Sequence, residues 1–193
     1  MCIRDSAEPP RFADPLIGST GPGTHVYLDI DGVLVTEPSP PFPRDFTTRD
    51  VRVADGRFVP VAYSASIIAG LAEILGAPGV TVATVSSWEH DAPYLFRVLG
   101  LPEYPWLEVM GRGPTIFHGK ERAVLADLAA QAQRSGQPPG RVLWIDDHLP
   151  PAEADRAALA ASLPAADALL IRTSARECLT AAHLGEIAEF VHR

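Results

Sequence analysis

Short apolar runs alternate along the chain with longer segments in which apolar residues recur every three or four positions. Runs of the first kind are typical of buried β-strands, and segments of the second kind are typical of amphipathic helices. The expected strands span residues 25–30, 79–85, 106–110, 141–146 and 167–172. The expected helices span residues 64–75, 91–99, 120–133, 152–162 and 180–192. Because strands that alternate with helices form βαβ units, we predict an α/β fold with a mainly parallel, five-stranded sheet covered on both faces.

One segment between the first two expected strands departs from this alternation. It starts with a Pro-rich loop, residues 37–43, and continues with two β-rich runs within residues 51–61. Asp55-Gly56 separates these runs, and this dipeptide favours the tight turn of a β-hairpin. We therefore expect an insert of loop and hairpin over residues 37–63. Farther along, Asp91 is expected to cap the second helix.

Composition limits the class of protein. The chain has 193 residues, of which 47% are hydrophobic, and a formal net charge of −8. The first six residues resemble a translated sequencing adapter, so we treat residues 7–193 as a single domain. No apolar run approaches the roughly 18 residues of a membrane span, and the start lacks a signal-peptide core. The acidic balance argues against a stable nucleic-acid complex, although a short nucleic-acid end remains open as a substrate.

The number of cysteines indicates in which cellular compartment the protein folds. Only two cysteines are present, which excludes a disulfide framework and a four-cysteine zinc site. If Cys2 belongs to the adapter-like start, Cys178 alone remains. A single cysteine fits a reducing compartment or simply a cysteine-poor protein, and we expect a cytoplasmic location.

Polar side chains follow three of the expected strands. Asp29 and Asp31 end the first strand, Ser86 follows the second, and Asp146 and Asp147 end the fourth. In parallel sheets the carboxyl ends of neighbouring strands meet at one edge, where ligands bind. Neighbouring carboxylates repel one another unless a cation or a substrate uses them. The sequence thus predicts one crevice that carries these groups.

Two other motifs fit the sequence less well. An EF-hand loop that starts at Asp29 would need Gly and Glu where Leu34 and Pro40 stand. Residues 113–121 resemble a P-loop but have the wrong glycine spacing and lack the metal-binding hydroxyl. Trp88 and His90 follow the second strand and are candidates for substrate contact, with a core or capping role equally open.

The phosphate-binding candidates are less specific on their own. Serine is common at strand ends, so Ser86 is a functional candidate only because the other motifs stand in register with it. Lys120 by itself is typical of a solvated helix residue, and nearby Arg122 could take its role.

Taken together, the motifs resemble the haloacid dehalogenase (HAD) superfamily. Residues 27–34 match its first motif, Ser86 its second, Lys120 its third and residues 144–147 its fourth. The order and spacing agree over residues 25–172. The resemblance implies a HAD-like Rossmannoid fold, a three-layer αβα sandwich with a minimal hairpin cap.

The resemblance also implies a phosphatase mechanism. Asp29 would attack phosphorus and form an aspartyl phosphate, and Asp31 would protonate the leaving oxygen and then activate water. Ser86 and Lys120 would hold the phosphoryl oxygens. Because Asp31 occupies the position that chooses the reaction, phosphatase or phosphotransferase chemistry is implied. A non-catalytic module that binds a phosphorylated ligand on the same fold remains an alternative.

Mg²⁺ is the cofactor that the resemblance implies. The side chain of Asp29, the backbone carbonyl of Asp31 and the side chain of Asp146 would be its ligands, with Asp147 beside them. The choice between Asp146 and Asp147 as the direct ligand stays open.

The expected insert is too small for a full cap domain. We therefore expect an open site, which in this superfamily often goes with macromolecular or other large substrates. Residues 86–91 and 179–184 further resemble small HAD domains that are grouped with multidomain RNA-repair proteins. The expected partner is a phosphorylated substrate, either a small molecule or a nucleic-acid end.

Overall fold

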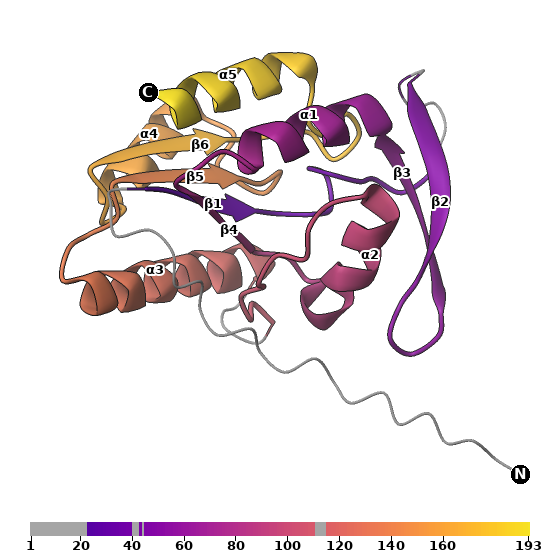
Figure 1. Cartoon of the computed structure of the whole chain (residues 1–193), viewed down its shortest axis with the longest axis horizontal. Helices are drawn as coiled ribbons and strands as arrows, with labels where there is room; N and C mark the ends of the chain where they lie inside the picture. Colours follow the sequence, from indigo (N-terminus) through magenta and orange to yellow (C-terminus); the bar gives the residue numbers. More distant parts are fainter. Residues whose placement is uncertain (1–22, 40–42, 44, 111–114) are drawn as a thin grey trace, which may run out of the picture.

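The computed structural model describes residues 23–39, 43, 45–110 and 115–193. The adapter-like residues 1–6 and part of the Pro-rich loop lie outside the described residues. Four parallel strands form one sheet in the order β4-β1-β5-β6, and β2 and β3 form a separate antiparallel hairpin (Figure 1). The strands are β1 (Thr24–Leu28), β2 (Phe46–Arg52), β3 (Phe58–Ser64), β4 (Val80–Thr84), β5 (Arg141–Ile145) and β6 (Asp167–Ile171). The helices are α1 (Ala65–Leu75), α2 (Ala92–Leu99), α3 (Ile116–Ser135), α4 (Glu153–Ser162) and α5 (Ala181–His192), with a 3-10 turn η1 (Glu89–Asp91) before α2.

Helices cover both faces of the four-stranded sheet. On one face, buried residues of α1, α2, α5 and the hairpin pack together with Val26, Leu28 and Ile145. On the other face, α3 and α4 pack against Tyr27 and Trp144. Because neighbouring residues of a strand point to opposite faces, β1 and β5 contribute to both apolar layers. The predicted three-layer α/β architecture is therefore confirmed.

The predicted fifth strand is wrong. Residues 106–110 contribute only an isolated bridge between Thr84 and Trp106. Pro105, directly before that bridge, has no N–H group with which to extend a ladder. Beyond the bridge, the N–H groups of Val109 and Met110 donate to the carboxylate of Glu89, at 2.9 and 3.0 Å. These donors are thus satisfied by a side chain and not by a neighbouring strand.

The start of α3 and the capping of α2 also differ from the prediction. Helix α3 begins at Ile116, where the side chain of Thr115 accepts the N–H of His118. Lys120 consequently lies inside the helix, whereas the apolar pattern placed it at the start. Asp91 does occupy the position before α2, but its side chain makes no capping hydrogen bond there.

The hairpin is longer than the sequence indicated and packs beside α2. Val51 and Val61 are buried, and they belong to the same core as α1 and α2. Asp91 fastens the tip region, because its Oδ1 accepts the backbone N–H of Ala54 at 2.9 Å. In Figure 1 the hairpin lies beyond α2, at one end of the molecule. Across the described residues, no helix combines the length and apolarity that a bilayer crossing requires.

Candidate active site

The strand ends meet as predicted, because the sheet holds them in register. Leu28 pairs with both Thr84 and Ile145 across the sheet. Just beyond this pairing, the N–H of Asp29 donates to the carbonyl of Ile145 at 3.0 Å. The N–H of Val85 donates to the carbonyl of Leu28 at 2.9 Å. The next residues along the three strands are therefore brought to one edge. Asp29, Ser86 and Asp146 are each at most 2% exposed there.

Lys120 reaches this edge from α3. Its Nζ lies 2.6 Å from Oδ2 of Asp29 and 2.9 Å from Oδ2 of Asp146, and its side chain is only 2% exposed. The ammonium group thus bridges the first and fourth motifs. Of the two cations that the sequence offered here, the structure brings Lys120 to the carboxylates.

The three charges shift one another's pKa values. Burial, together with the charge of Asp146, raises the pKa of Asp29 above its ordinary value, and Lys120 only partly opposes this. Burial acts to lower the pKa of Lys120, but the two carboxylates outweigh it and the net direction is upward. Burial also acts to raise the pKa of Asp146, yet contacts with His148 and Lys120 bring it below its ordinary value. One ammonium group therefore does not fully neutralise the two carboxylates.

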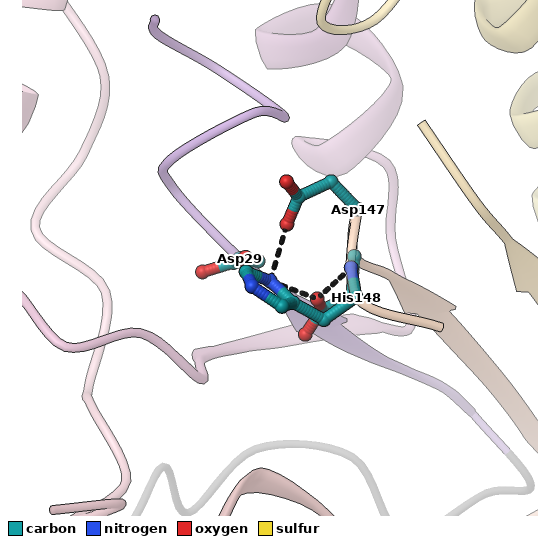
Figure 2. Close-up of side chains that lie close together, drawn as sticks. Asp29, Asp147 and His148 are labelled. Atoms are coloured by element: carbon teal, nitrogen blue, oxygen red, sulfur yellow. Dashed lines mark hydrogen bonds and ion pairs between the residues drawn. The ribbon is translucent and has the colours of Figure 1, made fainter. Parts of the chain in front are cut away.

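Asp147 and His148 complete the cluster. His148 Nδ1 lies 2.6 Å from Oδ1 of Asp147, and the backbone N–H of His148 donates to Oδ1 of Asp146 at 2.8 Å. Figure 2 shows the Asp147 carboxylate and the His148 imidazole directed toward one another beside Asp29. Gly32 makes room for this arrangement, since a Cβ there would stand 2.5 Å from Oδ2 of Asp147.

Asp31 and Trp88 form a second, adjoining unit. The indole Nε1 of Trp88 donates to both carboxylate oxygens of Asp31, each at 3.0 Å. Burial raises the pKa of Asp31, although the indole N–H favours the ionised form. A raised pKa suits a group that must carry a proton before it donates one. Trp88, a candidate for substrate contact, is thus hydrogen-bonded to Asp31, the candidate acid.

A cleft of about 670 Å³ opens in front of Asp31. Its walls come from the loop after β1, the hairpin, residues 87–88 and residues 175–176. Arg57, Trp88 and Arg176 are among the lining residues, and the guanidinium group of Arg57 also pairs with the carboxylate of Asp55. His90 is not among the lining residues; its side chain is 69% exposed and lies 3.7 Å from the carboxylate of Asp91. The structure therefore brings all the site candidates together except His90.

Sequence reasoning missed His148 and Arg176. The position of His148 directly after the Asp146-Asp147 pair was an available signal, but the six histidines show no metal-ligand spacing among themselves. Arg176 offered no signal, since it lies in a loop that only the fold brings to the cleft.

The cluster fits a divalent cation. Ligand atoms of Asp29, Asp146, Asp147 and His148 all lie within 4.8 Å of one another. Oδ2 of Asp146 and Oδ1 of Asp147 are buried and make no hydrogen bond of normal geometry, although each has an ion-pair contact. Carboxylate oxygens in this number are suitable ligands for a hard divalent ion.

A parallel sheet flanked by helices, with four polar motifs at its carboxyl edge, defines a HAD-type α/β domain. The chain belongs to the family described as the HAD domain in Swiss Army Knife RNA repair proteins, whose model matches residues 25–184. Among solved structures, the chain is similar to a probable YrbI family phosphatase from Pseudomonas syringae pv. phaseolica 1448a. That likeness has 18% identity and a TM-score of 0.39, and covers 88% of this chain and 84% of the other. The search of curated proteins found no match.

Proposed function

We propose that the protein is a Mg²⁺-dependent phosphatase that hydrolyses phosphate monoesters through an aspartyl phosphate on Asp29. The observation that carries the proposal is the buried contact of Lys120 with Asp29 and Asp146, at 2.6 and 2.9 Å, beside an open cleft that Asp31 lines. A nucleophile, an acid and a phosphate-binding cation are thus available within one site. Membership of a HAD family supports the same chemistry.

In the first step, Oδ of Asp29 attacks phosphorus and the bond to the leaving oxygen breaks. Asp31 gives its proton to that oxygen, so the leaving group departs as a neutral alcohol. In the second step, Asp31 takes a proton from water, which attacks phosphorus. The bond between Asp29 and phosphorus then breaks, and inorganic phosphate is released.

The other residues hold charge and position. Lys120 neutralises the phosphoryl oxygens, and Ser86, whose buried Oγ makes no hydrogen bond, is free to donate to one of them. A divalent cation, when bound by Asp29, Asp146 and the backbone carbonyl of Asp31, supplies further neutralisation of the phosphoryl charge. We assign Asp147 to the same cation site.

The substrate is proposed to be a phosphate at the end of a large molecule, of which a nucleic-acid end is one case. The proposal takes the cleft beside Asp31, which the hairpin lines together with the loop after β1 and residues 175–176, as open to a large substrate. Arg57 and Trp88 are then placed to contact the body of the substrate.

The test compares the wild-type protein with Asp29→Asn on p-nitrophenyl phosphate and on 3′- and 5′-phosphorylated oligonucleotides, with Mg²⁺ or with chelator. We expect phosphate release by the wild type only with Mg²⁺, and release at background level by Asp29→Asn. Circular dichroism would check that the variant is folded. Phosphate release that survives in Asp29→Asn would remove the covalent mechanism. Binding of phosphorylated ligands without turnover would instead support the non-catalytic module, and transfer to an added alcohol would support a phosphotransferase.

A further inference from the structure

His148 is a nitrogen donor inside a cluster of carboxylates. Its Nδ1 lies 2.6 Å from Oδ1 of Asp147 and 3.7 Å from Oδ1 of Asp146. Asp29 completes the set, with all four ligand atoms within 4.8 Å of one another. Opposite ligands of a small divalent ion stand about 4 Å apart, so the four groups need only a small contraction to share one ion.

The local chain geometry holds the imidazole in this position. Asp146, Asp147 and His148 are consecutive residues after β5, and the N–H of His148 donates to Oδ1 of Asp146 at 2.8 Å. That bond closes a tight turn, which directs the side chains of Asp147 and His148 to the same ion-pair contact. The His148 side chain is 49% exposed. Its ring can therefore shift without breaking a packed core.

The buried oxygens of the cluster add a second observation. Oδ2 of Asp146 and Oδ1 of Asp147 make no hydrogen bond of normal geometry. Their nitrogen neighbours are Nζ of Lys120 and Nδ1 of His148, at 2.9 and 2.6 Å. Burial of such oxygens is costly unless a cation compensates it. Lys120 bridges Asp29 and Asp146, and among the described residues it is His148 that meets Asp147.

We propose that His148 is a direct ligand of the divalent cation, which gives the centre a preference for Mn²⁺-class transition metals over Mg²⁺. The inference rests on the cation site of the proposed function and extends it to the choice of metal. Imidazole nitrogen suits transition metal ions, whereas Mg²⁺ favours carboxylate, carbonyl and water oxygen. A metal ion binds the neutral imidazole, so any proton on Nδ1 of His148 would leave to solvent when the ion binds.

The alternative is that His148 only orients Asp147 by hydrogen bonding. In that case the loss of His148 would weaken Mg²⁺ and Mn²⁺ binding alike, because both ions use the same carboxylate. Direct ligation predicts unequal losses. A nitrogen contact to the ion itself separates the two cases without reference to activity.

The experiment titrates Mg²⁺ and Mn²⁺ separately by calorimetry into the full chain and into His148→Ala and His148→Gln. The matched control is His192→Gln, at the far end of α5. We expect the wild type to bind Mn²⁺ more tightly, and both His148 variants to lose at least about tenfold in Mn²⁺ affinity but less than about threefold in Mg²⁺ affinity. The control variant should retain both affinities.

Electron spin echo measurements on the Mn²⁺-loaded proteins supply the direct readout. Coupling to a directly bound ¹⁴N is expected in the wild type and in His192→Gln, and its absence in His148→Ala. Tight Mn²⁺ binding without nitrogen coupling would overturn the ligand role of His148, as would equal losses for the two ions. If the wild type hydrolyses esters under those conditions, the proposed function survives and only this inference fails. If neither ion binds the wild type, the cation requirement of the proposed function fails as well.

Discussion

Lys120 shows how strongly single residues depend on one another in this site. Asp29 and Asp146 are almost completely buried, so neither carboxylate has water to stabilise its charge. A single ammonium group contacts both of them. Coulomb attraction in such surroundings repays the desolvation of the charges only while every partner is present. The residue that binds the substrate phosphate in our proposal therefore also stabilises the fold.

Replacement of Lys120 by Met is expected to destabilise the protein. Removal of one partner from a buried ion pair costs about 3–5 kcal/mol, because the remaining charges stay uncompensated. A divalent ion at the same carboxylates would restore part of that loss. Urea unfolding with and without Mg²⁺ measures both effects. The double variant Asp29→Asn/Lys120→Met is the control and should be more stable than Lys120→Met without metal. Equal losses with and without Mg²⁺ would argue that the ion does not bind these carboxylates.

Gly32 offers a second prediction at the residue scale. Its φ is +71°, and a Cβ there would stand 2.5 Å from Oδ2 of Asp147. Gly32→Ala should therefore displace Asp147 and weaken divalent-ion binding by at least about tenfold, as calorimetry would record. Gly79→Ala is the matched control, because Gly79 has φ +81° and no neighbour within 4 Å of an added Cβ.

Both glycine variants carry the strain of a side chain at positive φ, about 1–2 kcal/mol. Thermal unfolding should thus show a loss of stability in both proteins, with a larger loss in Gly32→Ala because Asp147 must also move. Only Gly32→Ala should lose the ion. Unchanged ion binding in Gly32→Ala would mean that Asp147 moves aside without effect and is not needed at the cation site.

At the scale of elements, sequence reasoning succeeded where periodicity and burial agree. The runs that became β1, β4, β5 and β6 are apolar and bounded by polar residues, so hydrophobic pattern alone placed them. Residues 106–110 resembled such a run, but backbone donors there are taken by Glu89 and the ladder stops at Pro105. The start of α3 was missed because Thr115, its N-cap, precedes the apolar pattern.

The candidate site was predictable as far as it depends on strand ends. Asp29, Ser86 and Asp146 follow directly from the parallel register. His148 and Arg176 lie in loops, where no period reports which way a side chain points. Their place in the site depends on a turn after β5 and on the packing of residues 173–179, and these are tertiary features.

The hairpin supplies a prediction at this scale. Asp91 Oδ1 accepts the N–H of Ala54, which fastens the hairpin turn to the start of α2. Asp91→Ala removes that acceptor, and loss of one hydrogen bond of about 1 kcal/mol raises the open population about fivefold. Limited trypsin digestion would detect this as faster cleavage after Arg52 and Arg57. Asp91→Asn keeps a carbonyl acceptor and should be cleaved at nearly the wild-type rate. Equal rates in all three proteins would show that packing of Val51 and Val53 holds the hairpin alone.

On the scale of the whole molecule, the net charge disfavours binding of a polyanionic substrate, whereas the cleft favours it. The net charge of −8 repels polyanions at a distance. Close to the site, Arg57 and Arg176 line an open cleft beside Asp31. A large phosphorylated substrate would therefore be held by a few local contacts near its scissile phosphate, with little help from the general field of the protein.

Salt dependence tests that balance on a 3′-phosphorylated oligonucleotide. Two contacts from Arg57 and Arg176 would give a slope of about −1.4 in log(kcat/KM) against log salt, or about a sevenfold loss between 50 and 200 mM. Arg176→Gln should reduce the magnitude of the slope by about 0.7, whereas Arg134→Gln, at the end of α3 and outside the cleft lining, should leave it unchanged. Hydrolysis of p-nitrophenyl phosphate should be slower and nearly insensitive to Arg176→Gln, because that ester has no second anionic group. A much steeper slope would point to an extended basic track, and turnover confined to one small metabolite would contradict the open-cleft proposal.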